Sequence, residues 1–121
     1  MNHIFILICM IFCHIVDDYY LQGWLASAKQ KEWWQKNCPQ DLYKYDYIIA
    51  LLMHAFSWTF SVMLIPTIIA EAWYPVLFIT NFLLHSYIDN EKANNKTINL
   101  VTDQLIHIIQ IVATWFVMFI K

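Results

Sequence analysis

Glycine and arginine are nearly missing from this sequence. Its 121 residues include one glycine, and all seven basic residues are lysines. A single glycine excludes the glycine-rich loops that cradle phosphates. The lack of arginine excludes bidentate guanidinium clamps on phosphate or carboxylate groups. The net charge of −2 gives no support for binding to nucleic acid, which needs a basic surface.

Cysteine is also scarce, and its spacing favours no cysteine chemistry. There are three cysteines, an odd number, and none forms a CxxC pair. Cys9 and Cys13 lie four residues apart in an apolar segment, where buried unreactive thiols are common. We therefore expect neither a disulfide framework nor a thiolate zinc site.

Hydrophobic residues make up most of the chain. The chain is 60% hydrophobic and 13% charged, whereas soluble domains are about 45–50% apolar and about 25% charged. Its length allows a single domain, residues 1–121. Four apolar segments approach the ~20 residues that a helix needs to cross a bilayer, so the sequence predicts an all-α integral membrane four-helix bundle. The predicted spans are residues 4–22, 47–65, 68–89 and 99–120.

The first span lacks the basic start and the cleavage motif of a signal peptide, and we expect it to be retained as a membrane helix. After it, residues Trp24 to Asn37 interleave tryptophans with lysines and predict an interfacial amphipathic helix. Pro66 predicts a tight turn between the second and third spans. Six lysines lie in the two loops that share one side, which places both termini outside the cytoplasm by the positive-inside rule.

Histidine and aspartate form a repeated pattern inside the apolar segments. Residues four apart on a helix share one face, and ionisable groups within a membrane span usually mark a functional site. With the predicted topology, all the histidines of the pattern lie roughly 6–12 Å from the cytoplasmic face at ~1.5 Å per residue. We therefore expect one polar, cytoplasm-facing site. The pattern consists of the pairs His14/Asp18, His85/Asp89 and Asp103/His107, and of a lone histidine, His54.

Imidazole and carboxylate groups are the usual ligands of zinc, and they also suit iron or manganese. One tetrahedral ion needs fewer donors than this set offers, so some donors would orient ligands or a second ion would bind. A bound metal would activate water, with one aspartate as general base and Lys92 steadying an anionic group. Asp17 points about 100° away from Asp18, and we interpret it as a boundary residue. The candidate metal ligands are His14, Asp18, His54, His85, Asp89, Asp103 and His107, and the candidate catalytic residues are Asp18, Asp89, Asp103 and Lys92.

The order of these motifs is distinctive. HIVDDYYLQ at residues 14–22 resembles H-x-x-x-D-F-x-L-Q, and a lysine (Lys29 or Lys31) and the pair His54-Ala55 follow. HSYIDNEK at residues 85–92 is similar to H-F-x-x-D-x-x-K, and DQLIH at residues 103–107 to D-Q-x-x-H. Together they resemble the domain of unknown function 3307 family over nearly the whole chain.

The resemblance implies a small multi-pass protein of the bacterial cytoplasmic membrane, encoded by a bacterium or a phage, and it implies no activity. It associates Gln22 and Gln104 with the site, and it points to Lys92 as well. The departures from the pattern, at Tyr19, Tyr20 and Asn90, do not touch the His/Asp set.

Three functions agree with these observations, and whether the protein is an enzyme stays open. The first is a metal-dependent hydrolase of a lipid-linked or phosphorylated substrate. The second is a non-enzymatic membrane interaction protein, such as a phage factor for host-membrane modification or superinfection exclusion, with a purely structural His/Asp network. The third is an ion or proton conduit, which is disfavoured because the outer half of every span is almost wholly apolar. A thin four-helix bundle also leaves a homodimer open.

Overall fold

The structure is a computed structural model that describes residues 2–120, and these residues form helices and connecting turns without a strand. The all-α prediction is therefore confirmed. The helices are α1 (His3–Val16), α2 (Leu25–Ala28), α3 (Lys31–Asn37), α4 (Asp46–Ala70), α5 (Pro75–Asn90) and α6 (Leu100–Phe119).

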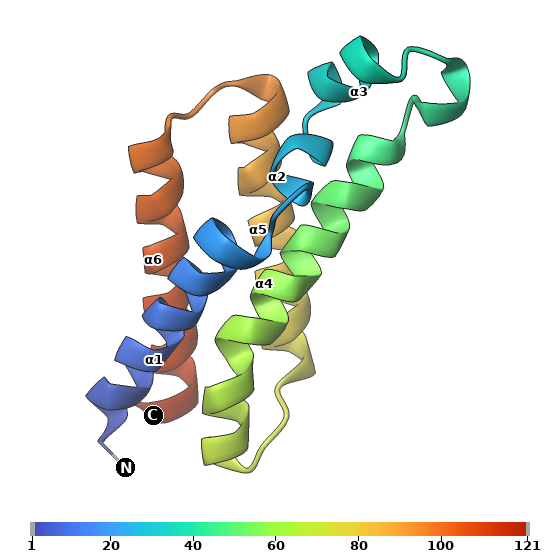
Figure 1. Cartoon of the computed structure of the whole chain (residues 1–121). Helices are drawn as coiled ribbons and strands as arrows, with labels where there is room; N and C mark the ends of the chain where they lie inside the picture. The colour runs from blue at the N-terminus through green and yellow to red at the C-terminus, as the bar shows by residue number, and fades with distance from the viewer. Residues whose placement is uncertain (1, 121) are drawn as a thin grey trace.

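The four long helices pack side by side (Figure 1), with α4 in contact with α1, α5 and α6. At one end of this bundle, the Trp115 indole near the end of α6 donates a hydrogen bond to the carbonyl of His3 at the start of α1 (2.7 Å). We call this the terminal end. The segments that connect α1 to α4 and α5 to α6 lie at the opposite end, the loop end, where Lys96 pairs with Glu32 at 2.6 Å.

Three helical stretches are long and apolar enough to cross a membrane: His3–Leu21, Asp41–Ala70 and Leu100–Phe119. The first of them includes a π-helical segment, Asp17–Leu21, that continues α1. Helix α5 has 16 residues, fewer than the ~20 that span a bilayer, but it continues into a second π-helical segment, Glu91–Asn95.

The boundary between α4 and α5 differs from the prediction. Pro66 lies buried inside α4, so the predicted turn at this residue and the predicted start of the third span at residue 68 are wrong. Helix α4 ends instead at Ala70, because the next residue, Glu71, has a left-handed backbone (φ 49°) that stops the helix. Pro75 occupies the first turn of α5. Pro66 removes one backbone donor from α4, but the helix continues through it to Ala70.

The predicted interfacial helix is divided into α2 and α3. Between them, the Asn94 side chain donates to the carbonyl of Lys29 (3.0 Å) and accepts from the backbone N–H of Lys31 (2.7 Å). These bonds take the place of backbone hydrogen bonds within a helix. They attach the break between α2 and α3 to the π-helical segment after α5. Edge-to-face contacts join the three indoles of Trp24, Trp33 and Trp34, with ring centroids 5.1–5.9 Å apart.

Polarity in this bundle is inverted relative to a soluble protein. Large apolar side chains cover the outside, for example Phe12 (64% exposed) and Ile109 (59% exposed). The interior holds an apolar core and also the charged groups described below. An outer surface of this kind is suited to hydrocarbon. The core consists of Ile6, Met10, Trp58, Val62 and Ile111.

Candidate metal centre

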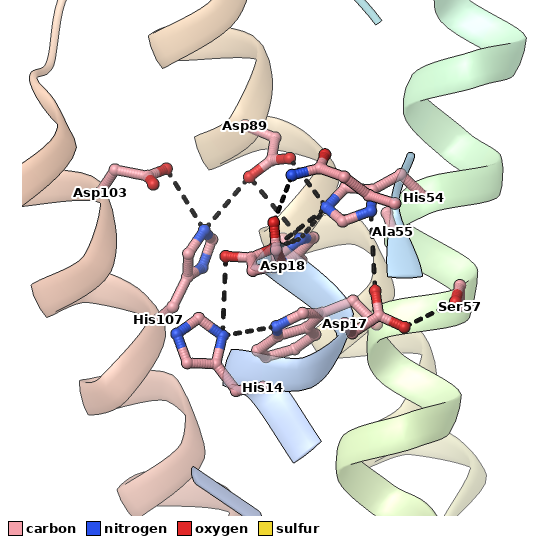
Figure 2. Close-up of polar contacts among 12 residues, drawn as sticks. His14, Asp17, Asp18, His54, Ala55, Ser57, Asp89, Asp103 and His107 are labelled. Carbon is pink, nitrogen blue, oxygen red and sulfur yellow. Dashed lines mark hydrogen bonds and ion pairs between the residues drawn. The ribbon is translucent and has the colours of Figure 1, made fainter. Parts of the chain in front are cut away.

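All seven candidate ligands are buried in the part of the bundle toward its loop end, with side chains from α4, α5, α6 and the end of α1 and its π-helical extension (Figure 2). His54, His85, Asp103 and His107 are 0% exposed, and Asp18 is the most exposed of the set at 8%. Four segments that are far apart in the sequence therefore bring ionisable groups to one place.

There are two groups of three residues, and within each group the ligand atoms lie close enough together to hold one metal ion. The first consists of Asp18, His54 and His85, and the second of His85, Asp89 and His107. His85 belongs to both. Its Nε2 lies 3.3 Å from His54 Nε2 and 3.6 Å from Asp89 Oδ1, so one nitrogen faces both groups. The two groups are thus parts of one continuous cluster.

The distances within this cluster fit a small divalent ion. Ligands about 2.0–2.1 Å from zinc in a tetrahedral arrangement are about 3.3 Å from one another. His54 Nε2 lies 3.1 Å from Asp18 Oδ1 and 3.3 Å from Asp89 Oδ2, and His107 Nε2 lies 3.2 Å from Asp89 Oδ1. The donor set, imidazole nitrogen with carboxylate oxygen, also suits zinc, iron or manganese.

Among the Nδ1 atoms of the same histidines, only that of His54 has a carboxylate from residues 2–120 nearby. Nδ1 of His54, His85 and His107 is buried without a hydrogen-bond partner. A histidine that binds a metal through Nε2 carries its proton on Nδ1, and a carboxylate or carbonyl commonly faces that proton. His54 has such a neighbour, because Asp17 Oδ1 lies 3.6 Å from its Nδ1.

The interpretation of Asp17 as a boundary residue is wrong. Its side chain is 0% exposed and accepts hydrogen bonds from the hydroxyl groups of Ser57 (2.7 Å) and Ser61 (3.1 Å) on α4. The reason is that consecutive residues of a helix point in different directions. This difference directs Asp18 to the inner side of His54 and Asp17 to its outer side.

Two lysines from the loop end reach into the cluster. Lys29, at the end of α2, donates to Asp89 Oδ2 at 2.7 Å, and Lys92 donates to Asp103 Oδ2 at 2.8 Å. Lys92 lies in the π-helical segment after α5. Both lysines therefore serve as fixed positive charges beside the carboxylates.

The buried cluster carries an excess of negative charge. Four carboxylates face two ammonium groups, which leaves two negative charges when the histidines are neutral. Uncompensated charge is costly in an apolar bundle. One divalent cation would balance the excess. The four carboxylates are those of Asp17, Asp18, Asp89 and Asp103.

The remaining predicted residues lie next to the cluster rather than within the two ligand groups. His14 contacts Trp58 and Gln104 through its two ring nitrogens. Gln104 donates to the carboxylates of Asp18 (3.1 Å) and Asp103 (3.0 Å). Gln22 instead donates to the backbone carbonyl of Asp18, and its Oε1 is buried without a partner.

Sequence reasoning missed part of the site. Lys29 was one of two alternatives in the motif, and the structure shows Lys29 at Asp89 while Lys31 contacts Asn94 through its backbone. Trp58 gave a weak signal as the residue four positions after His54, on the same helix face. Its ring stacks on His85, with centroids 4.1 Å apart and planes at 15°.

Comparison with known proteins gives one match. The model of a protein family of unknown function, DUF3307, matches residues 6–121, nearly the whole chain. No curated protein and no solved structure matches it.

Proposed function

The chain belongs to the DUF3307 family, and we propose that it is a four-span protein of the bacterial cytoplasmic membrane with one buried divalent metal ion. We further propose that it hydrolyses a lipid-linked or phosphorylated substrate at that ion. The observation that carries the proposal is the convergence of three histidine Nε2 atoms with the carboxylates of Asp18 and Asp89.

The inverted polarity of the bundle supports the membrane location. Three helical stretches meet the length and hydropathy of a span, and α5 with its π-helical continuation supplies the fourth. The lysines other than Lys121 belong to the two loop-end connections and the helix caps beside them. The positive-inside rule then orients the loop end, and the site with it, toward the cytoplasm.

Zinc is the favoured ion, with iron or manganese as alternatives. Catalytic zinc sites commonly have three protein ligands, either three histidines or two histidines with a carboxylate, and the fourth position is left for water or substrate. We assign one ion rather than two, because the same nitrogen of His85 faces both groups and a single divalent charge balances the cluster. Three of the residues of the two groups would bind it directly, and the others would orient these ligands. The residues of the two groups are His54, His85, His107, Asp18 and Asp89.

A bound ion of this kind would lower the pKa of its water and so provide a nucleophile at neutral pH. Asp103 is the carboxylate best suited to accept the proton, because it lies beside the ligand groups and its Oδ1 is 3.3 Å from His107 Nε2. Lys92 holds the other oxygen of Asp103 and has a side chain that is 34% exposed. It can therefore meet an anionic group that arrives from the loop end.

The test is metal-dependent release of phosphate by the purified protein in detergent. The substrate offered is a polyprenyl diphosphate, whose hydrolysis gives polyprenyl phosphate and inorganic phosphate, with and without a chelator. We expect phosphate release that stops with the chelator, returns with zinc, and is lost in Asp103→Asn. Gln110→Leu, a substitution of a buried polar residue outside the cluster, should retain activity. A metal-loaded protein that releases no phosphate would contradict hydrolysis and favour a non-enzymatic membrane interaction protein.

A further inference from the structure

A directed chain of hydrogen bonds runs along the outer side of the cluster. The Trp58 indole N–H can only donate, and it donates to His14 Nδ1 at 2.8 Å. Neutral His14 therefore carries its proton on Nε2, which donates to Gln104 Oε1 at 3.0 Å. The amide nitrogen of Gln104 is then left to donate to Asp18 and Asp103. Every donor and acceptor in this chain is determined by the indole.

The chain of bonds determines which carboxylate oxygens face the ligand groups. Gln104 Nε2 holds Oδ2 of Asp18 at 3.1 Å and Oδ2 of Asp103 at 3.0 Å. The opposite oxygens then face histidines, because Asp18 Oδ1 lies 3.1 Å from His54 Nε2 and Asp103 Oδ1 lies 3.3 Å from His107 Nε2. One amide thus orients two carboxylates from different helices.

His14 has no free nitrogen for a metal in this arrangement. Its Nδ1 accepts from Trp58 and its Nε2 donates to Gln104, so either nitrogen could bind an ion only after a buried hydrogen bond broke. The same indole stacks on His85, with ring centroids 4.1 Å apart. The position of Trp58 is therefore linked to a ligand ring and to the carboxylates.

We propose that Trp58, His14 and Gln104 form a positioning relay, and that His14 orients the metal centre without binding the ion. The relay rests on the metal site of the proposed function. It revises the sequence-based list of ligands at one residue. Its role is to hold two aspartates in the orientation that a ligand and a proton acceptor require.

The first test compares Co²⁺ binding by His14→Leu and His14→Gln. Leucine removes both hydrogen bonds, whereas glutamine offers an acceptor to Trp58 and a donor to Gln104. We expect His14→Leu to bind one equivalent about 10–100-fold more weakly, with altered visible absorption bands, because this is the usual effect of losing an orienting partner. His14→Gln should regain most of the affinity and the wild-type bands. His3→Leu, which replaces an exposed histidine at the terminal end, should match wild type.

Three results would overturn the relay. Complete loss of the Co²⁺ equivalent in His14→Leu, as expected for His85→Leu, would make His14 a ligand. Unchanged affinity and bands would make it a packing residue. Equal weakening in the glutamine and leucine variants would exclude the hydrogen bonds as the cause. If His14→Leu fails to fold, Trp58→Phe replaces it, because phenylalanine keeps a ring against His85 and removes only the donor.

The second test needs no metal, so it separates the relay from the metal site. In nitrogen NMR of the metal-free protein with labelled histidine, His14 should be the neutral tautomer protonated on Nε2. Trp58→Phe should disturb that signal more than the signal of His3. A His14 protonated on Nδ1 would contradict the relay. Absence of Co²⁺ binding by the wild type, with the expected tautomer, would contradict the metal site and leave the hydrogen-bond chain intact.

Discussion

Two polar clusters lie inside this apolar bundle, and they differ in how completely their groups are paired. The neutral cluster consists of Asn81, Gln110 and Thr114, one turn closer to the terminal end than the charged cluster. The Gln110 amide donates to the carbonyl of Asn81 (2.9 Å) and to its Oδ1 (2.8 Å), and the Asn81 amide donates to Thr114 Oγ1 (2.9 Å). One side-chain atom of this cluster, Gln110 Oε1, is buried without a hydrogen-bond partner.

The charged cluster leaves far more unpaired. Three buried Nδ1 atoms lack hydrogen bonds, and the Nε2 atoms of His54 and His85 face each other at 3.3 Å. Neighbouring groups that present lone pairs to one another need a cation or protons between them. The neutral cluster closes on itself, as an interhelical contact in a membrane does. The neutral cluster therefore has the pairing of a packing contact, whereas the charged cluster has groups that could hold a metal ion.

The largest difference between the clusters should appear in metal affinity. We expect His85→Leu to weaken zinc binding by more than about 100-fold, beyond the range for an orienting partner, because His85 faces both ligand groups. His54 and His107 each belong to only one of the two groups. His54→Leu and His107→Leu therefore leave the other group intact and should weaken zinc binding less. A competition titration against a chromophoric chelator measures all three.

Gln110→Leu is the matched control from the neutral cluster. It removes a polar side chain that is buried to a similar degree, on the same helix as His107, and it should leave zinc affinity unchanged. If Gln110→Leu weakened zinc binding as much as His85→Leu does, both clusters would belong to one structural network and the contrast would fail.

The next effect concerns the lysines of the loop end. Lys29→Met leaves Asp89 without its cation, and removing one partner of a buried pair costs about 3–5 kcal/mol. We expect a loss of this size in the free energy of unfolding of the metal-free protein, measured by denaturant titration in detergent. Lys96→Met breaks the exposed pair with Glu32 and should cost about 0–1 kcal/mol. If both variants lost the same free energy of unfolding, the Lys29–Asp89 pair would stabilise the protein no more than the exposed Lys96–Glu32 pair does.

Asp17 tests the outer side of the charged cluster. Asp17→Asn keeps the shape of the side chain but removes the carboxylate behind His54, so zinc affinity should fall about 10–100-fold. Ser61→Ala removes one hydrogen bond to the same carboxylate and serves as the milder comparison. Unchanged affinity in Asp17→Asn would limit Asp17 to a contact between α1 and α4.

The smallest effect should come from the neutral cluster itself. Asn81→Leu removes the amide that joins α5 to α6, and interhelical hydrogen bonds in membranes average about 0.6 kcal/mol, with a maximum of about 1.7. We expect a small decrease in melting temperature and a normal metal content. Loss of the metal in this variant would show that the neutral cluster is part of the metal site, and it would favour the ion conduit as the function.

The sequence predicted the helical class and the convergence of the His/Asp pairs. Residues four apart lie on one face of a helix, and the length of each apolar segment indicates how far a residue lies from the membrane surface. Sequence-based prediction failed where tertiary contacts override local signals. Pro66 lies inside α4 although proline is disfavoured in a helix interior. Asn94 divides α2 from α3 through a bond to Lys31, which is 63 residues away in the sequence. The burial of Asp17 depends on hydroxyl groups of α4, and no local pattern reveals such partners.

The central claim is that the charged cluster binds one divalent ion. Elemental mass spectrometry of the detergent-purified protein tests it most directly, beside the double variant His85→Leu/His107→Leu and the neutral-cluster variant Asn81→Leu/Gln110→Leu. We predict about one equivalent of zinc, iron or manganese in the wild type and in the neutral-cluster variant, and none in the histidine variant. No metal in a folded wild-type protein, even after incubation with zinc, would contradict the claim and make the charged cluster a hydrogen-bond network.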